Sequence, residues 1–324
     1  MADVIGIDLG GTQLRAVRCD ADGVIKAHLA MPTPTSGPSD VVAAMTHLIE
    51  ALRADAAANE ISGIGVGTPG PVDGPRGIVF EAPNLPGWNN VPLKDMLRAR
   101  LQLPVEVGND ANVAGLGEWI FGSGRGTRDF VYVTISTGIG GGVIMDGRLL
   151  LGRKGMAAEV GHMIIEANGP ICGCGNRGCW EVLASGTALA RRAAEEMQHT
   201  PTTKLHSMAT PATVTAVDVW EAAQQHDALS RTLLHEEGTL IGVGVVNLLH
   251  LFSPARIALG GGVMHSFELL RDPLLATITA RAMESYRDVP VTIAKLGQNV
   301  GVLGAAALLL LAQPQAHPEH QLLP

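Results

Sequence analysis

Four side chains that bind metals well lie close together within residues 161–181, GHMIIEANGPICGCGNRGCWE. They are His162, Cys172, Cys174 and Cys179. Three thiolates and one imidazole form a closed tetrahedral zinc site of the structural kind, which leaves no open position for catalysis. The C-x-C-x4-C spacing lacks a second Cys or His pair and differs from that of common nucleic-acid zinc fingers. Buried free thiols are the alternative interpretation of these residues.

Disulfide bonds are another use of clustered cysteines, and the start of the chain argues against them. MADVIGIDLGG has no basic segment and carries Asp3, which is not the pattern of a signal peptide. Without an export signal we expect a cytoplasmic location, and its reducing conditions favour zinc over disulfides. The remaining cysteine, Cys19, is expected to be a plain thiol.

Two carboxylates flank the cysteine segment and suggest a ligand with hydroxyl groups. Glu159 stands in EVGH and Glu181 in CWE, so a zinc ion would hold both of them rigidly. Sugar hydroxyls donate hydrogen bonds to carboxylates, and His162 could bind zinc with one ring nitrogen and a hydroxyl with the other. The alternative is that both glutamates are solvated surface charges.

A further acid occupies the junction between a predicted strand and a predicted helix. EVGNDANVA places Asn109 and Asp110 there. An acid at this position often caps the helix. It can also act as the general base of phosphoryl transfer, where a carboxylate accepts the proton of the attacking hydroxyl. Asn109 would then bind a neighbouring hydroxyl, and position alone leaves both interpretations open.

Glycine-rich turns suggest phosphate binding. IDLGGT, residues 7–12, places Asp8 near the end of a buried strand, followed by Gly10, Gly11 and Thr12. Glycines let backbone N–H groups approach a phosphate closely, and Thr12 adds a hydroxyl donor. Asp8 can hold Mg²⁺ directly or through water. The alternative is an ordinary hairpin turn beside an acid.

Two similar clusters occur later in the chain. STGIGGG, residues 136–142, repeats the arrangement with Thr137 and Gly138. LGGGV, residues 259–263, follows a predicted strand and precedes a helix. The glycines of this cluster are Gly260, Gly261 and Gly262. Three clusters at strand ends predict a cleft around a nucleotide.

Two well-known nucleotide motifs do not apply. GVGTPG, residues 65–70, matches G-x-G-x-x-G, but prolines flank its end and no helix follows directly. The sequence also contains no G-x-x-x-x-G-K-[ST] segment.

The elements that position these residues alternate between strands and helices. Residues 4–30 read as three strands with tight turns, and a second apolar strand–glycine–strand segment covers 129–152. This echo predicts two similar α/β halves. Further strands are expected at 61–70, 104–110, 256–264 and 291–296, and helices at 40–58, 91–101, 111–122, from the cysteine segment to about 252, and from about 300. The tail, 313–324, is expected to be loose.

Composition agrees with a large two-lobed chain. The 324 residues are 46% hydrophobic and 17% charged, with 40 glycines, so a sizeable core is available. The net charge of −8 argues against nucleic-acid and anionic-membrane partners. The most apolar predicted helix is shorter than the roughly 20 residues of a membrane span.

At this point the chain resembles the ROK family of sugar kinases (repressor, open reading frame, kinase), within the actin-like ATPase superfamily, and most closely the bacterial zinc-containing glucokinases. The resemblance covers nearly the full length. It rests on DLGGT, GVGTPGPVD, PNLPGW, NDANVAGLGE, TISTGIGGGVI, AAEVGHM, CGCGNRGCWE and ALGGGV. Of these, EVGH followed by CGCGNRGCWE is the most specific.

The resemblance implies an α/β, two-domain actin-like ATPase (ribonuclease H-like) fold with a ligand cleft between the domains. The expected small domain comprises 1–110 plus a returning helix at about 299–313. The expected large domain comprises 111–298 and includes the zinc loop. Family members are usually homodimers or homotetramers, and the same is expected here. Repressor members carry an N-terminal helix-turn-helix, for which we expect no room before the first strand.

The resemblance also implies residue roles, with Asp110 as catalytic base. Sugar contacts would fall on Gly70, Asn84, Asn109, Asp110, Glu159, His162 and Glu181. ATP with Mg²⁺ would lie along Asp8, Gly10, Gly11, Thr12, Thr137, Gly138, Gly260, Gly261 and Gly262. Structural Zn²⁺ would be held by His162, Cys172, Cys174 and Cys179.

The expected reaction is ATP-dependent phosphorylation of a hexose, with glucose converted to glucose 6-phosphate. Alternative substrates within this class are N-acetylglucosamine, N-acetylmannosamine, mannose, allose and fructose. A different class of function is a non-catalytic sugar-sensing regulator, which need not keep a catalytic base or a Mg²⁺-binding acid.

Overall fold

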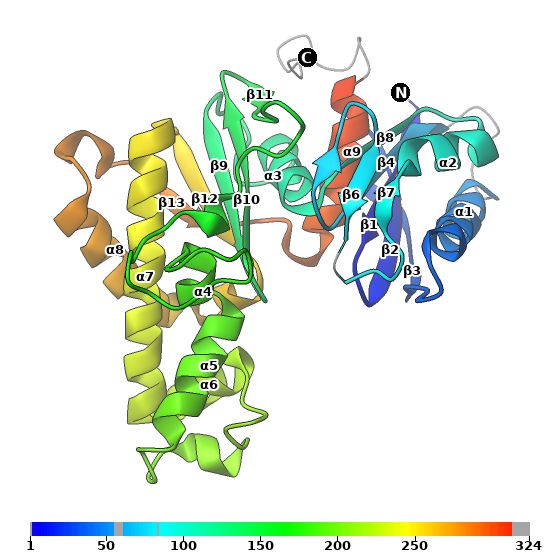
Figure 1. Ribbon diagram of the computed structural model, residues 1–324. Coiled ribbons are helices and arrows are strands. Elements are labelled where there is room, and N and C mark those ends of the chain that lie inside the picture. The colour runs from blue at the N-terminus through cyan, green and yellow to red at the C-terminus, as the bar shows by residue number, and fades with distance from the viewer. Residues whose placement is uncertain (1, 55–60, 83, 313–324) are drawn as a thin grey trace. The chain divides into compact units, whose positions relative to one another are not determined.

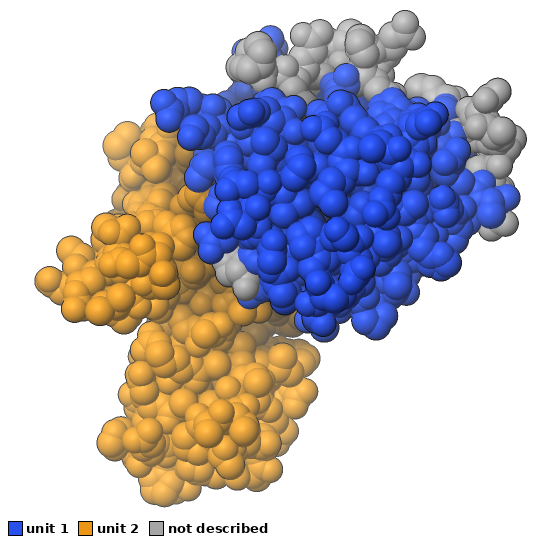
Figure 2. Space-filling view, turned by 45° about the vertical axis from the view of Figure 1, so that its right-hand side comes forward, with its two compact units in different colours: residues 1–132, 142–158, 294–324 blue, residues 133–141, 159–293 orange. Residues whose placement is uncertain are grey.

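The computed structural model describes residues 2–54, 61–82 and 84–312, and the chain divides into two compact units. Unit 1 comprises Met1–Tyr132, Gly142–Ala158 and Ala294–Pro324. Unit 2 comprises Val133–Gly141 and Glu159–Ile293. Figure 1 labels their helices and strands, and Figure 2 colours the two units.

The main sheet of unit 1 has five strands in the order β3-β2-β1-β4-β8. The strands are β1 (Asp3–Leu9), β2 (Gln13–Cys19), β3 (Ile25–Pro32), β4 (Ile61–Thr68) and β8 (Val105–Asn109). β1 and β2 form an antiparallel hairpin, whereas β1, β4 and β8 are parallel, so their carboxyl ends meet at one edge. This edge carries Asp8 and Asn109.

The two faces of this sheet are covered by different helices because side chains alternate along each strand. Ile5 and Ile7 join the core beneath α1 (Pro38–Ala54) and α2 (Leu93–Leu101). Val4 joins a second apolar cluster with residues of α9 (Val300–Ala312). Nearly every side chain from Val302 to Leu311 is buried, as expected for a helix that is apolar all round.

The remaining elements of unit 1 surround this core. α3 (Asp110–Ile120) begins directly after β8 and packs against α9. A small antiparallel sheet contains β5 (Val72–Asp73), β6 (Ile78–Glu81) and β7 (Asn89–Val91).

The second large sheet has the order β11-β10-β9-β12-β13. Its strands are β9 (Phe130–Ile135), β10 (Ile139–Met145), β11 (Arg148–Leu149), β12 (Arg256–Gly260) and β13 (Val291–Ile293). β9 and β10 run from one unit into the other. The strand order repeats that of the first sheet. In each sheet, three strands that are consecutive along the chain lie side by side, and two strands from later in the chain follow them. This confirms the two similar halves predicted from the echo of glycine-rich strand pairs.

Helices make up most of unit 2. They are α4 (Trp180–Ala184), α5 (Gly186–Met197), α6 (Ala216–Gln224), α7 (Ala228–Phe252) and α8 (Phe267–Arg281). Short 3₁₀ turns include η1 (Val160–His162), η2 (Lys204–Ser207), η3 (Gly262–Ser266) and η4 (Glu284–Tyr286), and η5 (Gly297–Asn299) precedes α9 in unit 1. α7 and α8 pack side by side.

The division into units differs from the domain boundary expected after residue 110. α3 stays in unit 1 because it packs on α9, and residues 142–158 also belong to unit 1. The expected return of the last helix to the N-terminal part is seen in α9. Residues 55–58 of the expected first helix, residue 313 and the tail lie outside the described residues, as does Pro83 of PNLPGW. Among the helices of the described ranges, none combines the length and apolarity needed to cross a bilayer.

Candidate active site and metal centre

Asn109, rather than the neighbouring acid, caps helix α3. Its Oδ1 accepts hydrogen bonds from the backbone N–H groups of Ala111 (3.0 Å) and Asn112 (3.2 Å). These are donors that the first turn of a helix leaves without intrahelical partners. Asp110 is therefore the first residue of the helix, where its Oδ1 accepts from the N–H of Ala111 at 2.8 Å. Asn109 is therefore the cap residue, and Asp110 is half-buried at the positive end of α3, where one of its oxygens also accepts a backbone N–H.

Gly70 is hydrogen-bonded to Asn109. Its carbonyl accepts a hydrogen bond from Asn109 Nδ2 at 3.1 Å. The residue has a φ of +90°, and a Cβ atom there would lie 1.9 Å from the carbonyl oxygen of Glu81. Only glycine satisfies both conditions, so the TPG turn is held directly beside Asn109.

The turn of the DLGGT segment is a tight hairpin, and this corrects part of the sequence interpretation. The N–H of Gly10 donates to the carbonyl of Gln13 at 3.0 Å, and the carbonyl of Gly10 accepts from Thr33 Oγ1 at 2.7 Å. The N–H of Gly10 is therefore engaged within the turn rather than free for a phosphate. Gly11 packs against Asn84, and Thr12 is exposed on the turn.

Asp8 has a cationic partner that the sequence interpretation missed. Arg15 NH2 donates to Asp8 Oδ2 at 2.7 Å, while Arg15 NH1 donates to the carbonyl of Gln298 at 3.2 Å. Burial raises the pKa of Asp8 above its ordinary value, and Arg15 acts in the opposite direction. The signal was available, because residues 8 and 15 stand opposite each other across the β1–β2 hairpin.

Glu181 lies beside the second glycine turn, in unit 2. It belongs to the first turn of α4, and its Oε2 accepts the N–H of Ile139 at 3.0 Å. A Cβ atom at Gly138 would lie 2.3 Å from the same oxygen. The structure thus brings Glu181 and Gly138 together, and exposed Thr137 precedes them on the turn.

The third glycine cluster follows strand β12. Gly260 is the last residue of the strand, Gly261 has a φ of +88°, and Gly262 opens η3. Gly261 lies against the backbone of Ile135 at the end of β9. The cluster therefore stands beside the strand that leads into Thr137.

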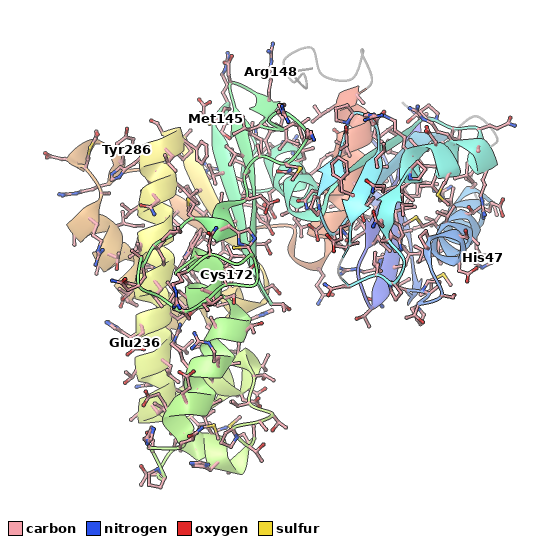
Figure 3. All side chains as sticks on the ribbon, in the orientation of Figure 1. His47, Met145, Arg148, Cys172, Glu236 and Tyr286 are labelled. Atoms are coloured by element: carbon pink, nitrogen blue, oxygen red, sulfur yellow. The ribbon has the colours of Figure 1, made fainter. Side chains whose placement is uncertain are left out.

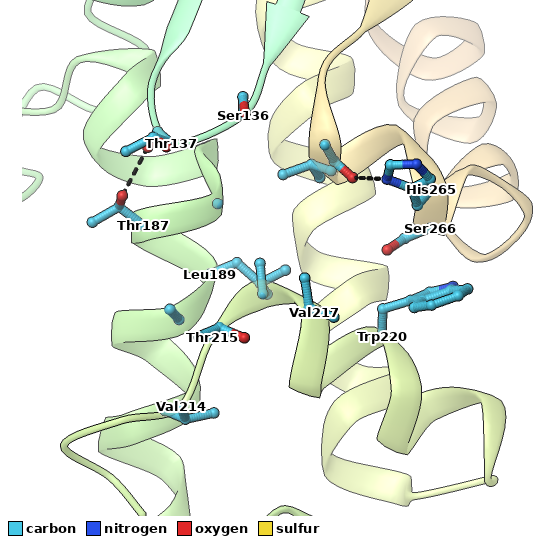
Figure 4. A pocket seen from close by; sticks show the side chains of 15 residues that line it. Ser136, Thr137, Thr187, Leu189, Val214, Thr215, Val217, Trp220, His265 and Ser266 are labelled. Carbon is cyan, nitrogen blue, oxygen red and sulfur yellow. Dashed lines mark hydrogen bonds between the residues drawn. The ribbon is translucent and has the colours of Figure 1, made fainter. Parts of the chain in front are cut away.

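A cavity of about 680 Å³ lies within unit 2. Thr137 and Gly262 line it, as the glycine clusters led us to expect. Most of its wall comes from residues without any motif, which the sequence interpretation missed: Thr187, Leu189, Val214, Thr215, Val217, Trp220, His265 and Ser266 among others (Figure 4). A cavity of this size, with mainly apolar walls and a few hydroxyls, is typical of a small-molecule or cofactor site.

The four candidate zinc ligands converge. One ligand atom from each of His162, Cys172, Cys174 and Cys179 lies within 4.8 Å of all the others. Cys172 Sγ is 3.7 Å from His162 Nδ1, and Cys174 Sγ is 3.6 Å from Cys179 Sγ. A tetrahedral ion with Zn–S bonds of about 2.3 Å requires S···S distances of about 3.8 Å, so the donor set fits Zn²⁺. Figure 3 labels Cys172 in this loop.

The thiols of this cluster have different environments. Burial raises the pKa of the Cys179 thiol to about 12. The backbone N–H of Asn176 lowers the pKa of the exposed Cys174 thiol. Binding of a metal displaces thiol protons in either case, because the thiolate is the ligand.

His162 and Glu159 meet at η1. The N–H of His162 donates to the carbonyl of Glu159 at 3.1 Å, and the Glu159 side chain is exposed. His162 presents Nδ1 to Cys172, which leaves Nε2 on the opposite edge of the ring. The candidate sugar-binding residues therefore form two groups: Gly70, Asn84, Asn109 and Asp110 in unit 1, and Glu159, His162 and Glu181 in unit 2.

Comparison with known proteins places these residues in a family. The sequence profile of the ROK family matches residues 4–312. A glucokinase of Thermotoga maritima is 36% identical over 309 residues, which are 94% of this chain and 96% of that protein. A xylose repressor of Bacillus spizizenii is 31% identical over 94% of this chain and 76% of its own length.

A solved structure agrees in fold. The ROK family glucokinase of Streptomyces griseus, crystallised with glucose and AMPPNP, has a TM-score of 0.81 and 35% identity. The match covers 95% of this chain and 99% of the other. It confirms the α/β actin-like class predicted from the sequence, and with the profile match it shows that this chain belongs to the ROK family.

Proposed function

We propose that the protein transfers the γ-phosphoryl group of ATP to a hexose, converting glucose to glucose 6-phosphate with release of ADP. The observation that carries the proposal is Asp110, held at the start of α3 by the Asn109 cap, in a chain similar to a glucokinase over 94% of its length. Phosphoryl transfer depends mainly on positioning and electrostatics, and a fixed carboxylate beside a helix N-terminus supplies both.

Asp110 is proposed as the general base. Its carboxylate accepts the proton of the 6-hydroxyl while that oxygen attacks the γ-phosphorus and ADP leaves. Asn109 uses one amide hydrogen to bind Gly70 and is proposed to offer the other to a neighbouring sugar hydroxyl. The cap thus orients the base and the sugar together.

The remaining sugar contacts are proposed for residues of both units. Gly70 and Asn84 belong to unit 1. Glu159, Glu181 and the Nε2 atom of His162 belong to unit 2. The carboxylates accept hydrogen bonds from hydroxyls, which favours a polyol over an anionic ligand.

The nucleotide is proposed to lie along the three glycine turns and in the cavity of unit 2. The assigned residues are Asp8, Gly10, Gly11, Thr12, Thr137, Gly138, Gly260, Gly261 and Gly262. Asp8 would hold Mg²⁺, which neutralises phosphate charge when it is bound. Because Gly10 uses its own N–H within the turn, its role is to let the backbone approach the phosphates rather than to donate to them.

Structural zinc is the proposed occupant of the cluster of His162, Cys172, Cys174 and Cys179. When bound, it supplies rigidity rather than chemistry, because four protein ligands complete its tetrahedral shell. Fixing this loop fixes His162 and Glu181 as well, because α4 begins directly after Cys179.

The decisive experiment measures ADP release from ATP–Mg²⁺ with glucose, N-acetylglucosamine, N-acetylmannosamine, mannose, allose and fructose in parallel. The proposal expects glucose to give the highest kcat/KM and the product to be glucose 6-phosphate. A clear preference for another of these sugars would replace glucose within the same reaction class. No turnover with any sugar, in folded and zinc-loaded protein, would refute the kinase.

A second candidate is a sugar-sensing regulator, favoured by the 31% identity to a xylose repressor. The same assay separates it from the kinase, since a regulator would bind sugar without releasing ADP. The cytoplasmic location and the homodimer or homotetramer remain predictions. Light scattering of the purified protein would test the assembly.

A further inference from the structure

The cavity of unit 2 has two chemically different ends. Thr137 and Thr187 stand at one end, next to the glycine turn, and His265, Ser266 and Trp220 stand at the other (Figure 4). A nucleotide is likewise divided, with charged phosphates at one end and a flat apolar base at the other. Glycine turns stand at both ends, Gly138 beside Thr137 and Gly262 beside His265. Only the second end also carries Trp220, whose flat ring suits a base, so the phosphates are assigned to the end with Thr137.

Two hydroxyls of the wall, those of Thr187 and Thr215, are engaged as donors. Thr187 Oγ1 donates to the carbonyl of Thr137 at 2.8 Å, and Thr215 Oγ1 donates to Asp218 Oδ2 at 2.6 Å. Thr215 and Asp218 also form the capping box of α6, in which each side chain accepts the backbone N–H of the other residue, so displacing the Thr215 side chain would cost helix stability. The hydroxyl hydrogens of Thr187 and Thr215 are therefore not available to bind a base.

His265 presents a defined acceptor. Its Nδ1 lies 2.8 Å from the carbonyl oxygen of Gly262, and a carbonyl only accepts hydrogen bonds. Nδ1 must therefore carry the hydrogen, and in the neutral ring Nε2 is then an acceptor. His265 is exposed and lines the cavity, so this acceptor is accessible to a ligand.

Trp220 supplies a flat surface. It is half-buried on α6, while the other three tryptophans of the chain are at most 3% exposed. Val217, one turn earlier on the same helix, also lines the cavity and is 59% exposed, which is unusual for valine. A ligand covering these two side chains would bury apolar surface that is otherwise open to water.

We infer that Trp220 stacks on the base of the donor nucleotide and that His265 Nε2 accepts the 6-amino group of adenine, which makes the two side chains determinants of donor specificity. The inference rests on the proposed function for the nature of the ligand. Hypoxanthine and guanine present a 6-oxo acceptor at the same position, which would face the lone pair of Nε2 and be disfavoured. A donor without a base, such as polyphosphate, gains nothing from either residue.

Equilibrium binding of ADP and IDP tests the inference without any chemical step, because the two ligands differ at position 6 of the base. Wild-type protein is expected to bind ADP about tenfold more tightly than IDP, since a polar pocket group left unpaired rejects an analogue. Quenching of tryptophan fluorescence by ADP should disappear in Trp220→Phe, while the affinity of this variant stays close to wild type.

Variants of Trp220 and of His265 should have different effects on the binding of ADP and IDP. Trp220→Ala is expected to weaken ADP and IDP equally, by about tenfold or more, because stacking ignores the base substituents. His265→Ala should weaken ADP and leave IDP unchanged or bound more tightly, because the lone pair that faces the 6-oxo group is gone, so that the preference over IDP falls to about one. His199→Ala, another exposed histidine, is the matched control and should leave both affinities unchanged. Competition by inorganic tripolyphosphate should be equal in all variants.

The outcomes separate this inference from the proposed function. If glucose is phosphorylated but the Trp220 and His265 variants bind ADP and IDP as the wild type does, the inference is overturned and the kinase stands. If the ADP and IDP pattern appears without phosphorylation of any sugar, the inference stands and the kinase fails. Because His265 is exposed, its variant should fold even if Trp220→Ala does not.

Discussion

At the scale of single residues, the hydrogen bonds of Asn109 determine the surroundings of the Asp110 carboxylate. Asn109 caps α3 by accepting the N–H groups of Ala111 and Asn112, while Asp110 Oδ1 also accepts the N–H of Ala111. Asp110 keeps a carboxylate near the positive end of α3, where the negative charge of the base form is favoured. This position agrees with the proposed role of Asp110 as general base.

Replacing Asp110 by Asn tests this assignment. The expected result is a fall in kcat of about 10²- to 10⁴-fold, because the amide cannot accept the hydroxyl proton. Glucose affinity, measured by calorimetry, should change little, since the amide keeps the size of the acid and one acceptor oxygen. Asp95→Asn, at an exposed acid of α2, is the control. Wild-type kcat in Asp110→Asn would refute the base.

Glu237 is the other acid whose environment predicts a measurable effect. It is fully buried on α7, where it accepts a hydrogen bond from Arg192, and burial raises its pKa from 4.5 to about 7. Between pH 4.5 and 7 the folded state therefore keeps the carboxyl proton of Glu237, whereas the unfolded state loses it. This contribution to stability is complete below pH 4.5 and is lost as pH rises through 7.

The Glu237→Gln variant should lack this dependence. We expect wild type and variant to have similar free energies of unfolding near pH 4.5, and the variant to be more stable by about 3 kcal/mol near pH 8. Urea denaturation at both values measures the difference. If the wild type instead gained stability over the variant on raising the pH, the ion pair with Arg192 would outweigh the cost of burial.

At the scale of elements, the close approach of α3 and α9 positions the proposed base. A Cβ atom at Gly304 of α9 would lie 2.0 Å from the carbonyl oxygen of Val113 on α3. Near the other end of α3, Glu118 accepts the N–H groups of Lys295 and Leu296, just before α9 begins. The helix that starts with Asp110 is thus fixed along its length by the returning end of the chain.

Gly304→Ala should disturb this arrangement. The added methyl group forces α3 and α9 apart, so we expect a loss of about 1–3 kcal/mol in the free energy of unfolding despite the higher helix propensity of alanine. Because α3 carries Asp110, kcat should fall as well. Gly74→Ala, whose Cβ would lie 3.7 Å from the nearest atom, is the matched control. Urea midpoints and kcat of both variants provide the test.

The cysteine loop is the second element whose order depends on a few contacts. We expect one zinc ion per chain, lost in Cys179→Ser and retained in Cys19→Ser, because Cys19 is buried in unit 1 and is not among the four clustered residues. Removal of the metal should lower Tm and weaken glucose binding together, since His162 belongs to both proposed sites. Metal analysis and calorimetry measure these effects. Unchanged melting after complete removal would contradict a structural ion.

At the scale of the whole molecule, the two large sheets have the same strand order but hold different parts of the proposed site. The first places the proposed base and Asp8 at its edge, and unit 2 supplies the cavity and the cysteine cluster. The ROK family includes both glucokinases and transcriptional regulators, so the charge of each chain bears on its partners. Here the net charge is −8.

This charge predicts no binding to duplex DNA at ~150 mM salt, because an acidic surface repels the phosphate backbone. Fluorescence anisotropy of a labelled duplex measures the interaction. Binding whose affinity falls steeply with salt would contradict the prediction and would favour the regulator.

The sequence by itself determined those features whose residues are close along the chain. The β1–β2 hairpin follows from two glycines between apolar strands, and the cluster of His162 and three cysteines follows from residues within 18 positions, where local turns can bring them together. The Asn109–Asp110 junction was equally local, although only the hydrogen bonds showed which residue is the cap.

Tertiary structure alone decided the contacts between distant segments. The cavity joins residues from 136 to 266, Arg192 meets Glu237 across 45 positions, and Glu118 meets Leu296 across 178. Trp220 and His265 belong to no sequence motif. They line the same cavity only because α6 and η3 pack together in unit 2. Apolar burial drives such packing, and because it has no direction, the residue pattern along the chain does not specify which helices meet.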